Sequence, residues 1–481
     1  MGREKVLHTS QINALILLYV AADTYGSDFY IGFMRNIGAS PFVSLRLIVG
    51  TPANSSVTFV VENNAGMIHT GTVTSSVPVA VTIPSDQQVT DSNFNNRLKG
   101  IHVYSTEGDP LYVVAENFLS FLNHGVYIAY PCLSLGENID RYEYGIVSVD
   151  DPTDTLNSQF LLVGCEDDTT ITITPTQSIT MPEDIQRSST VVTVEPGTTS
   201  HEITLNTMQT LLVLSVDDLT GTIIVSNKPL AVISGHECAN IPLSEAGCEP
   251  LAVQVPPIAT WGTKFLLAPF AGRDGPQAFR AVSSKSNTSY VYTCDSESRF
   301  APETSALSFF SAAYCYLQST DPVFLTELSF GGSIDSKGDP TISMISPLDQ
   351  YINAIDFVSL SSGEFPSNFI SVTVAAEHYN PDSILLDGQP INCVWWEITD
   401  RDANIIGYGC NKTVSSDSGR PKKHTVSHSE EDGLLSVLVY GFSSFPGRGY
   451  AYLAGQVLEI TEGRLSSTDN VAIYLHMASC S

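Results

Sequence analysis

A two-strand pattern recurs along this chain, and it constrains the fold more than any other sequence feature. In three copies a valine (Val49, Val163 or Val282) stands eight residues before the start of a second β-branched segment. The paired segments are 47–49 with 57–60, 161–163 with 171–174, 281–282 with 290–293 and, more loosely, 372–374 with 383–386. Because each intervening loop is polar and turn-rich, we expect every copy to form a β-hairpin.

A second pair of strands is expected after each copy. These pairs are 100–104 with 111–114, 221–225 with 230–233, 316–317 with 323–325, and 435–439 with 450–453. A proline lies in each turn, where a fixed φ and a missing amide donor cost little: Pro110, Pro229, Pro322 and Pro446. The repeating unit is then roughly 90 to 120 residues, the size of one β-sandwich domain. A β-propeller blade of about 40 to 50 residues fits this spacing less well.

The sequence therefore predicts an all-β fold, a tandem array of about four β-sandwich (Ig-like) units with inter-strand and loop disulfides. Helical periodicity is absent over long stretches, which supports this class. The expected organisation is a signal peptide at 1–22, units at 23–140, 141–257, 258–345 and 346–465, and a tail at 466–481.

The first residues have the layout of a secretory signal peptide. Arg3 and Lys5 precede an apolar stretch at 12–22, and small residues fit cleavage before Asp23. A buried first strand or helix remains the alternative, because acidic Glu4 lies in the same leader. No later apolar run approaches the roughly 18 residues of a membrane helix, and the C-terminus carries no lipid-anchor signal. We expect a secreted, extracellular protein without membrane insertion.

Nine cysteines fit an oxidising compartment. Proximity suggests four disulfides: Cys132 with Cys165, Cys238 with Cys248, Cys294 with Cys315, and Cys393 with Cys410. Cys480 is left over, and it either links to a partner chain or belongs to a tail outside the domain. Three glycosylation sequons, at Asn54, Asn287 and Asn411, add support for secretion.

The charge balance narrows the class of partner. The chain has 22 basic and 51 acidic residues, a formal net charge of −29. Such a surface repels phosphate backbones, which argues against nucleic-acid binding. The acidity serves either solubility or the binding of cations and basic partners.

Residues 228–265 carry a resemblance to a known family. The strand ending Gly235-His236-Glu237-Cys238, the small cysteine loop, the paired prolines and the turn at Trp261-Gly262 together resemble the N-terminal domain of IgGFc-binding protein. The likeness extends over about 24–460 and is most specific at 228–265. It implies an extracellular, mucin- or adhesion-associated domain linked with mucus and innate immunity. It assigns no ligand-binding residue.

Motifs for catalysis are absent. The position four residues after His236 is Asn240, so the histidine spacing of a zinc-binding helix is not met. His236 and Glu237 are better interpreted as hydrogen-bonding groups that fix the disulfide loop. Nucleophile elbows, phosphate-binding glycine loops and calcium loops are also missing. We predict no enzymatic activity, no cofactor and no metal site, although a carboxylate pair for glycan hydrolysis is defined only in space.

The predicted function is recognition or adhesion, in which surface loops bind a glycoprotein, an immunoglobulin-like protein or a mucin. The alternative is a structural component of matrix or mucus that is cross-linked by disulfides, with Cys480 as the link. Adjacent Trp395 and Trp396 bear on this choice: one of them would face solvent if they lie on a strand, whereas both would be covered if they pack between domains.

Overall fold

The computed structural model describes residues 24–458, apart from 38–41, 91–96, 120–121, 133–139, 151–155, 185–189, 201, 243, 245–246 and 445–446. The predicted signal peptide, the tail at 466–481 and Cys480 lie outside the described residues. The fold is all-β, as predicted, and its named strand pairs are antiparallel.

The first repeat forms two four-stranded sheets, β1-β6-β3-β4 and β5-β2-β7-β8. Its elements are β1 (Asp28–Ile31), β2 (Val43–Gly50), β3 (Val57–Asn63), β4 (Gly66–Val73), β5 (Val79–Ile83), η1 (Ser85–Gln87), β6 (Ile101–Ser105), β7 (Tyr112–Leu119) and β8 (Asn123–Ala129). Neighbouring Leu47 and Ile48 of β2 pack into two different cores, because successive strand residues point to opposite faces. This sheet is therefore covered on both sides.

The second repeat has the same strand order, with sheets β9-β16-β11-β14 and β15-β10-β17-β18. Its strands are β9 (Tyr142–Gly145), β10 (Ser158–Gly164), β11 (Thr169–Thr174), β12 (Ile179–Pro182), β13 (Val191–Val194), β14 (Ile203–Leu205), β15 (Thr210–Ser215), β16 (Ile223–Ser226), β17 (Leu230–Ala239) and β18 (Glu249–Gln254). The separate β12–β13 hairpin is an insertion in this pattern.

The third repeat keeps the order, although one long strand joins its two halves into a single seven-stranded sheet. Its elements are η2 (Ile258–Thr260), β19 (Gly262–Leu267), β20 (Gln277–Ser283), β21 (Tyr290–Cys294), β22 (Glu297–Ala301), β23 (Ala306–Ser311), β24 (Cys315–Leu328) and β25 (Ile342–Met344). The first part of β24 pairs with β19 and β21, and its second part pairs with β20 and β25.

The fourth repeat has the sheets β26-β32-β28-β29 and β30-β31-β27-β33-β34. Its elements are η3 (Leu348–Gln350), β26 (Ala354–Ser359), β27 (Ser367–Ala375), η4 (Ala376–His378), β28 (Ile384–Leu386), β29 (Gln389–Pro390), β30 (Trp396–Thr399), β31 (Ile405–Thr413), β32 (Lys422–His428), β33 (Leu435–Phe442) and β34 (Gly449–Leu453). Strand β30 is an addition to the four-stranded pattern, at the edge of its sheet.

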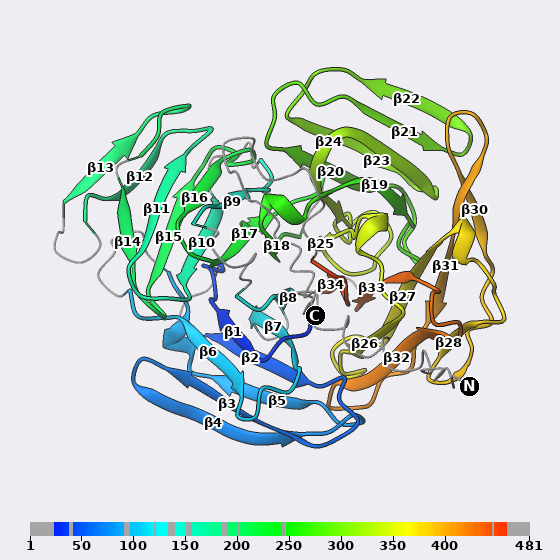
Figure 1. The fold of residues 1–481 in the computed structure, drawn as a ribbon, viewed down its shortest axis with the longest axis horizontal. Coiled ribbons are helices and arrows are strands. Elements are labelled where there is room, and N and C mark those ends of the chain that lie inside the picture. The colour runs from blue at the N-terminus through cyan, green and yellow to red at the C-terminus, as the bar shows by residue number, and fades with distance from the viewer. Residues whose placement is uncertain are drawn as a thin grey trace, which may run out of the picture.

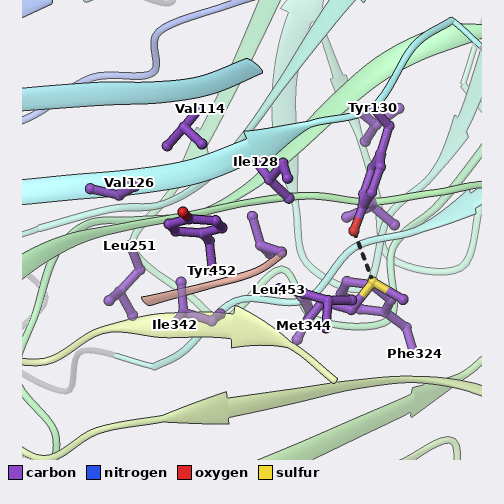
Figure 2. Packing of buried hydrophobic residues seen from close by; sticks show 14 of the residues in the cluster. Val114, Val126, Ile128, Tyr130, Leu251, Phe324, Ile342, Met344, Tyr452 and Leu453 are labelled. Atoms are coloured by element: carbon purple, nitrogen blue, oxygen red, sulfur yellow. Dashed lines mark hydrogen bonds between the residues drawn. The ribbon is translucent and has the colours of Figure 1, made fainter. Parts of the chain in front are cut away.

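The repeats follow one another around a common centre, and the fourth returns to the first (Figure 1). The last strand of each repeat is innermost: β8 and β25 each lie against both β18 and β34. Apolar side chains from all four repeats fill this centre, among them Val126, Leu251, Ile342 and Leu453 (Figure 2). One continuous core thus joins the repeats.

This ring differs from the predicted tandem array of Ig-like sandwiches. A sandwich unit buries one face of each sheet and leaves the other face in solvent. Here the central strands are covered on both faces, and every residue of β8, β10, β17 and β33 is buried. The other sheet of the repeat keeps one partly exposed face, as the alternating burial along β3, β6 and β11 shows. The predicted boundaries near 140, 257 and 345 lie between β8 and β9, β18 and β19, and β25 and β26.

The predicted hairpins are also corrected. The paired segments of the recurring pattern are β2 and β3, β10 and β11, β20 and β21, and β27 and β28, and the two members always belong to different sheets or halves of a sheet. In the first repeat Val49 and Val57 meet in one core from facing sheets. The chain therefore crosses between sheets at each loop. Of the second set of pairs, only β33 and β34 hydrogen-bond to each other as a hairpin.

Candidate functional site

The residues that carried the family resemblance are buried where neighbouring repeats meet. His236, Glu237 and Cys238 lie on β17 with almost no exposed surface. The Glu237 carboxylate pairs with Arg35 at 2.8 Å and accepts a hydrogen bond from Asn157 at 2.9 Å. The Nδ1 atom of His236 accepts a hydrogen bond from the amide of Cys238 at 3.1 Å. These contacts orient the disulfide loop from inside the protein.

Other residues of the resemblance form close-packed contacts. A Cβ atom at Gly235 would lie 1.8 Å from the carbonyl oxygen of Leu251, so β17 and β18 can approach only with glycine there. Trp261 is buried, and its Nε1 donates to the carbonyl of Pro256 at 3.0 Å. A Cβ at Gly262 would lie 2.0 Å from the Pro347 side chain. The resemblance thus rests on residues that hold repeats together.

Four disulfides link Cys132 to Cys165, Cys238 to Cys248, Cys294 to Cys315, and Cys393 to Cys410. These are the pairs that sequence proximity suggested. Cys294 and Cys315 are directly opposite each other on β21 and β24. The last of these links ties Cys410 on β31 to Cys393, which lies in the segment between β29 and β30.

The three sequons have different surroundings. Asn54 and Asn287 are exposed in corresponding loops, between the second and third strands of the first and third repeats. Asn411 is half-buried on β31. Its Nδ2 donates to the carbonyl of Pro269 at 2.8 Å, and its Oδ1 accepts from Tyr440 at 3.2 Å. A glycan on that nitrogen would break this network.

A charged cluster lies at one end of the ring's centre. Each repeat contributes one member at or near the start of its innermost strand: His124, Glu249, Asp339 and Arg448. The Glu249 carboxylate accepts a hydrogen bond from the amide of His124 at 2.6 Å. Burial raises the pKa of Glu249 well above its ordinary value, and burial raises that of Asp339 to about 6. All four side chains are buried, so the cluster is a joint between repeats and not a ligand site.

Exposed aromatic side chains mark a different region, the outer rim of the third repeat. Phe300 on β22 is 64% exposed, Phe310 on β23 is 62% exposed, and Trp396 on the neighbouring β30 is 57% exposed. Exposed Phe42 lies in the first repeat. Large solvent-facing aromatic side chains are typical anchors of protein interfaces. We therefore take this rim as the candidate ligand-binding site.

A groove lies between the third and fourth repeats at this rim, and we call it the inter-repeat groove. Its volume is about 530 Å³. One side is the outer face of the β21–β22 hairpin, with Val291 and Phe300 directly opposite each other. The other side is the tip of the β30–β31 hairpin, residues 400–402. Segments roughly one hundred residues apart thus form one concave surface.

A second depression lies on the opposite face of the β21–β22 hairpin, and we call it the rim cleft. It has a volume of about 670 Å³ between β22 and β23. Tyr292 and Phe309 stack in it at 4.1 Å between ring centroids. Asp295, Glu297 and Arg299 also line it. The hairpin therefore presents a usable surface on both faces.

The inter-repeat groove is acidic at its tip. Asp400 accepts hydrogen bonds from the side chain and the amide of Asn404, which lower the pKa of its carboxyl. Burial raises the pKa of Tyr316 to about 12, with a smaller contribution from the nearby Asp400 charge. Asp400 is thus ionised and the Tyr316 phenol is neutral at physiological pH. The groove combines hydroxyl groups, carboxylates and an apolar face.

Within the described ranges, no three histidine, cysteine or acidic side chains lie close enough to hold a metal ion. Among the residues that the structure describes, no helix is both long and apolar enough to span a membrane. The arrangement at the rim is suited to binding a polymer with polar and apolar groups by contact and charge.

Sequence reasoning identified part of this site. The Trp pair left two alternatives open, one exposed ring or two covered rings, and the structure has the first: Trp396 is exposed while Trp395 packs against Tyr379. Phe300 and the Asp400 tip were not singled out. The tip carried a detectable signal, since the run Thr399-Asp400-Arg401-Asp402 separates two apolar strands as a hairpin turn does.

Comparison with known proteins identifies a family. Residues 125–441 match the model of a family described as IgGFc binding protein. The match begins in β8 and ends in β33, so it includes both sides of the inter-repeat groove and is narrower than the 24–460 expected from sequence. Neither the curated proteins nor the solved structures contain a match.

Proposed function

The chain belongs to the IgGFc binding protein family, and on this premise we propose that it is a secreted recognition protein that binds a protein or glycoprotein without chemical turnover. Four disulfides support an oxidising, extracellular location. The family description supports a protein ligand, with immunoglobulin-like proteins and mucins as the classes to test first.

The observation that carries this proposal is the rim of the third repeat. Exposed Phe300 lines the inter-repeat groove, and exposed Trp396 lies on the neighbouring edge strand β30. Both are carried by a scaffold whose central strands are buried on both faces. Binding surfaces are commonly displayed on loops and edges of a rigid framework. Interfaces place most of their binding energy in a few such aromatic anchors.

The test is a binding screen of the full secreted chain against immobilised IgG Fc, mucins and a glycan array. We expect saturable binding to at least one class. Phe300→Ala should weaken it about tenfold, equivalent to ~1.4 kcal/mol. Phe42→Ala is the matched control, because Phe42 is 77% exposed in a different repeat.

Two outcomes would count against the proposal. Absence of binding across the whole panel would favour the structural alternative, a matrix or mucus component. In that case non-reducing gels should show disulfide-linked oligomers of the chain, and these should be lost when Cys480 is replaced by serine. Binding that is unaffected by Phe300→Ala would place the ligand elsewhere on the ring.

A further inference from the structure

Among the residues that the structure describes, strand β30 is paired on one side only, and the tip that follows it lines the inter-repeat groove. It is the terminal strand of the sheet β30-β31-β27-β33-β34, and β31 is its hydrogen-bonded partner. Figure 1 shows β30 at the outside of the fourth repeat, next to the third. An edge strand presents a row of amide and carbonyl groups that can pair with another chain.

The groove beside this edge fits a strand that is apolar on one face. Its floor is the β21–β22 hairpin, where Val291 and Phe300 form a cross-strand pair. Ile398 of β30 packs with Tyr316 of β24, so the edge strand is held against the third repeat. A segment added beside β30 would therefore rest half of its side chains on the apolar floor, because strand side chains alternate.

The charge of the protein surface determines which side chains the other half of the added segment should have. The tip at one end of the groove bears Asp400 and Asp402, and exposed Glu397 lies on β30 itself. Arg401 is the one cation in residues 397–402, and its Nε lies 3.5 Å from Asp402. The chain as a whole carries a net charge of −29. A basic segment is complementary to this surface, and an acidic one is repelled.

We propose that an extended, lysine- or arginine-bearing segment of a partner protein binds the inter-repeat groove by adding to β30 as a further antiparallel or parallel strand. This rests on the proposed function and specifies its mode of binding. Main-chain hydrogen bonds to β30 supply affinity that depends little on side chains, as in other complexes formed by strand addition. Selectivity comes from apolar residues on Val291 and Phe300 alternating with basic residues near Asp400 and Asp402.

A synthetic peptide of ten residues alternating valine and lysine is the probe. We expect it to bind the full chain, and we expect hydrogen exchange at the amides of residues 396–399 to slow by at least tenfold when it does. A peptide alternating valine and glutamate should bind at least tenfold more weakly. N-methylation of alternate amides along one edge of the valine–lysine peptide should abolish binding, because it removes the donors that strand addition needs.

Variants of the protein distinguish peptide binding at the inter-repeat groove from binding at the rim cleft. The double change Asp400→Asn with Asp402→Asn should lower the affinity for the valine–lysine peptide about two- to fivefold per carboxylate removed. This loss of affinity should be smaller at high salt, because salt screens the charges. Asparagine at 400 can still accept the amide hydrogen bonds that shape the turn. The control is Asp295→Asn with Glu297→Gln, which removes two exposed carboxylates from the rim cleft on the other face of the same hairpin.

The results distinguish this inference from the proposed function. Peptide binding without protection of β30, equal affinity for the lysine and glutamate peptides, or no binding would overturn strand addition. Protection confined to β22 and β23 would move the docking site to the rim cleft. In each case a positive screen with Fc, mucin or glycan would leave the proposed function standing.

Discussion

Thr24 and Gln456 exchange hydrogen bonds across 432 residues of sequence. The amide of Thr24 donates to the carbonyl of Gln456 at 3.0 Å, and the amide of Gln456 donates to the Thr24 Oγ1 at 2.8 Å. Neither residue has exposed surface. The first described residue is thereby fixed to the segment that follows β34, which closes the ring.

Thr24→Val should therefore destabilise the whole chain. Valine has nearly the same shape as threonine but leaves the amide of Gln456 buried without its acceptor, which costs about 1–3 kcal/mol. The free energy of unfolding in urea measures this loss. Thr58→Val is the control, because Thr58 is exposed on β3. An equal, small effect of both changes would contradict a role for Thr24 in closure.

Replacing Glu116 should reduce the free energy of unfolding far more than replacing Glu364, although both carboxylates contact Arg46. Burial alone would raise the pKa of Glu116, but hydrogen bonds from Arg46 and His124 outweigh it and lower the pKa to about 2. Glu116→Ala leaves the Arg46 charge without its buried partner and should cost about 3–5 kcal/mol. Glu364→Ala removes a partly exposed partner and should cost at most ~1 kcal/mol. Similar losses in thermal or urea unfolding would refute the distinction.

Glu327 should make stability fall as pH rises. Its side chain is buried on β24, and burial raises its pKa well above the ordinary 4.5. The folded state therefore holds a proton that the unfolded state releases above pH 4.5, so the stabilisation is lost as pH rises toward the folded-state pKa. Glu327→Gln should flatten this slope and be the more stable protein at pH 8. Urea unfolding at pH 5 and pH 8 decides the question, with exposed Glu297→Gln as the control.

Glycans should be found at Asn54 and Asn287 and not at Asn411. The first two side chains are exposed in loops, whereas both polar atoms of the Asn411 side chain are hydrogen-bonded between β31 and neighbouring segments. Enzymatic deglycosylation in heavy-oxygen water, followed by peptide mass mapping, identifies the occupied sites. A glycan on Asn411 of the folded, secreted protein would contradict the hydrogen-bond network described above.

The repeating pattern specified strands but not their partners. Val49 and Val57 sit at the ends of their strands as the sequence predicts, yet they face each other across a core instead of pairing in a hairpin. A turn-rich loop between two alternating segments is compatible with both outcomes. The alternation of apolar and polar residues indicates which side chains of a strand share a face. It does not indicate which strands are hydrogen-bonded to each other, because that depends on the path of the backbone.

The candidate site shows the same division. For the adjacent Trp395 and Trp396, strand geometry offered one exposed ring as an alternative to two covered ones, and only the structure decided for the first. Phe300, by contrast, is one of 21 phenylalanines in the chain, and nothing local marks it as exposed. Its significance comes from the third repeat meeting the fourth, which brings it beside residues 400–402.

The sequence by itself determined the strand-rich class, the fourfold recurrence and the close spacing of each cysteine pair, because these are local properties of pattern and composition. Only the tertiary structure decided that the repeats close into a ring, that the signature residues His236 and Trp261 are buried joints, and that a groove opens beside β30. The reason is physical: the sheets that carry the innermost strands have two apolar faces to cover, and the neighbour that covers the second face lies in another repeat. That contact, like the link from Thr24 to Gln456, has no signature in any short stretch of the chain.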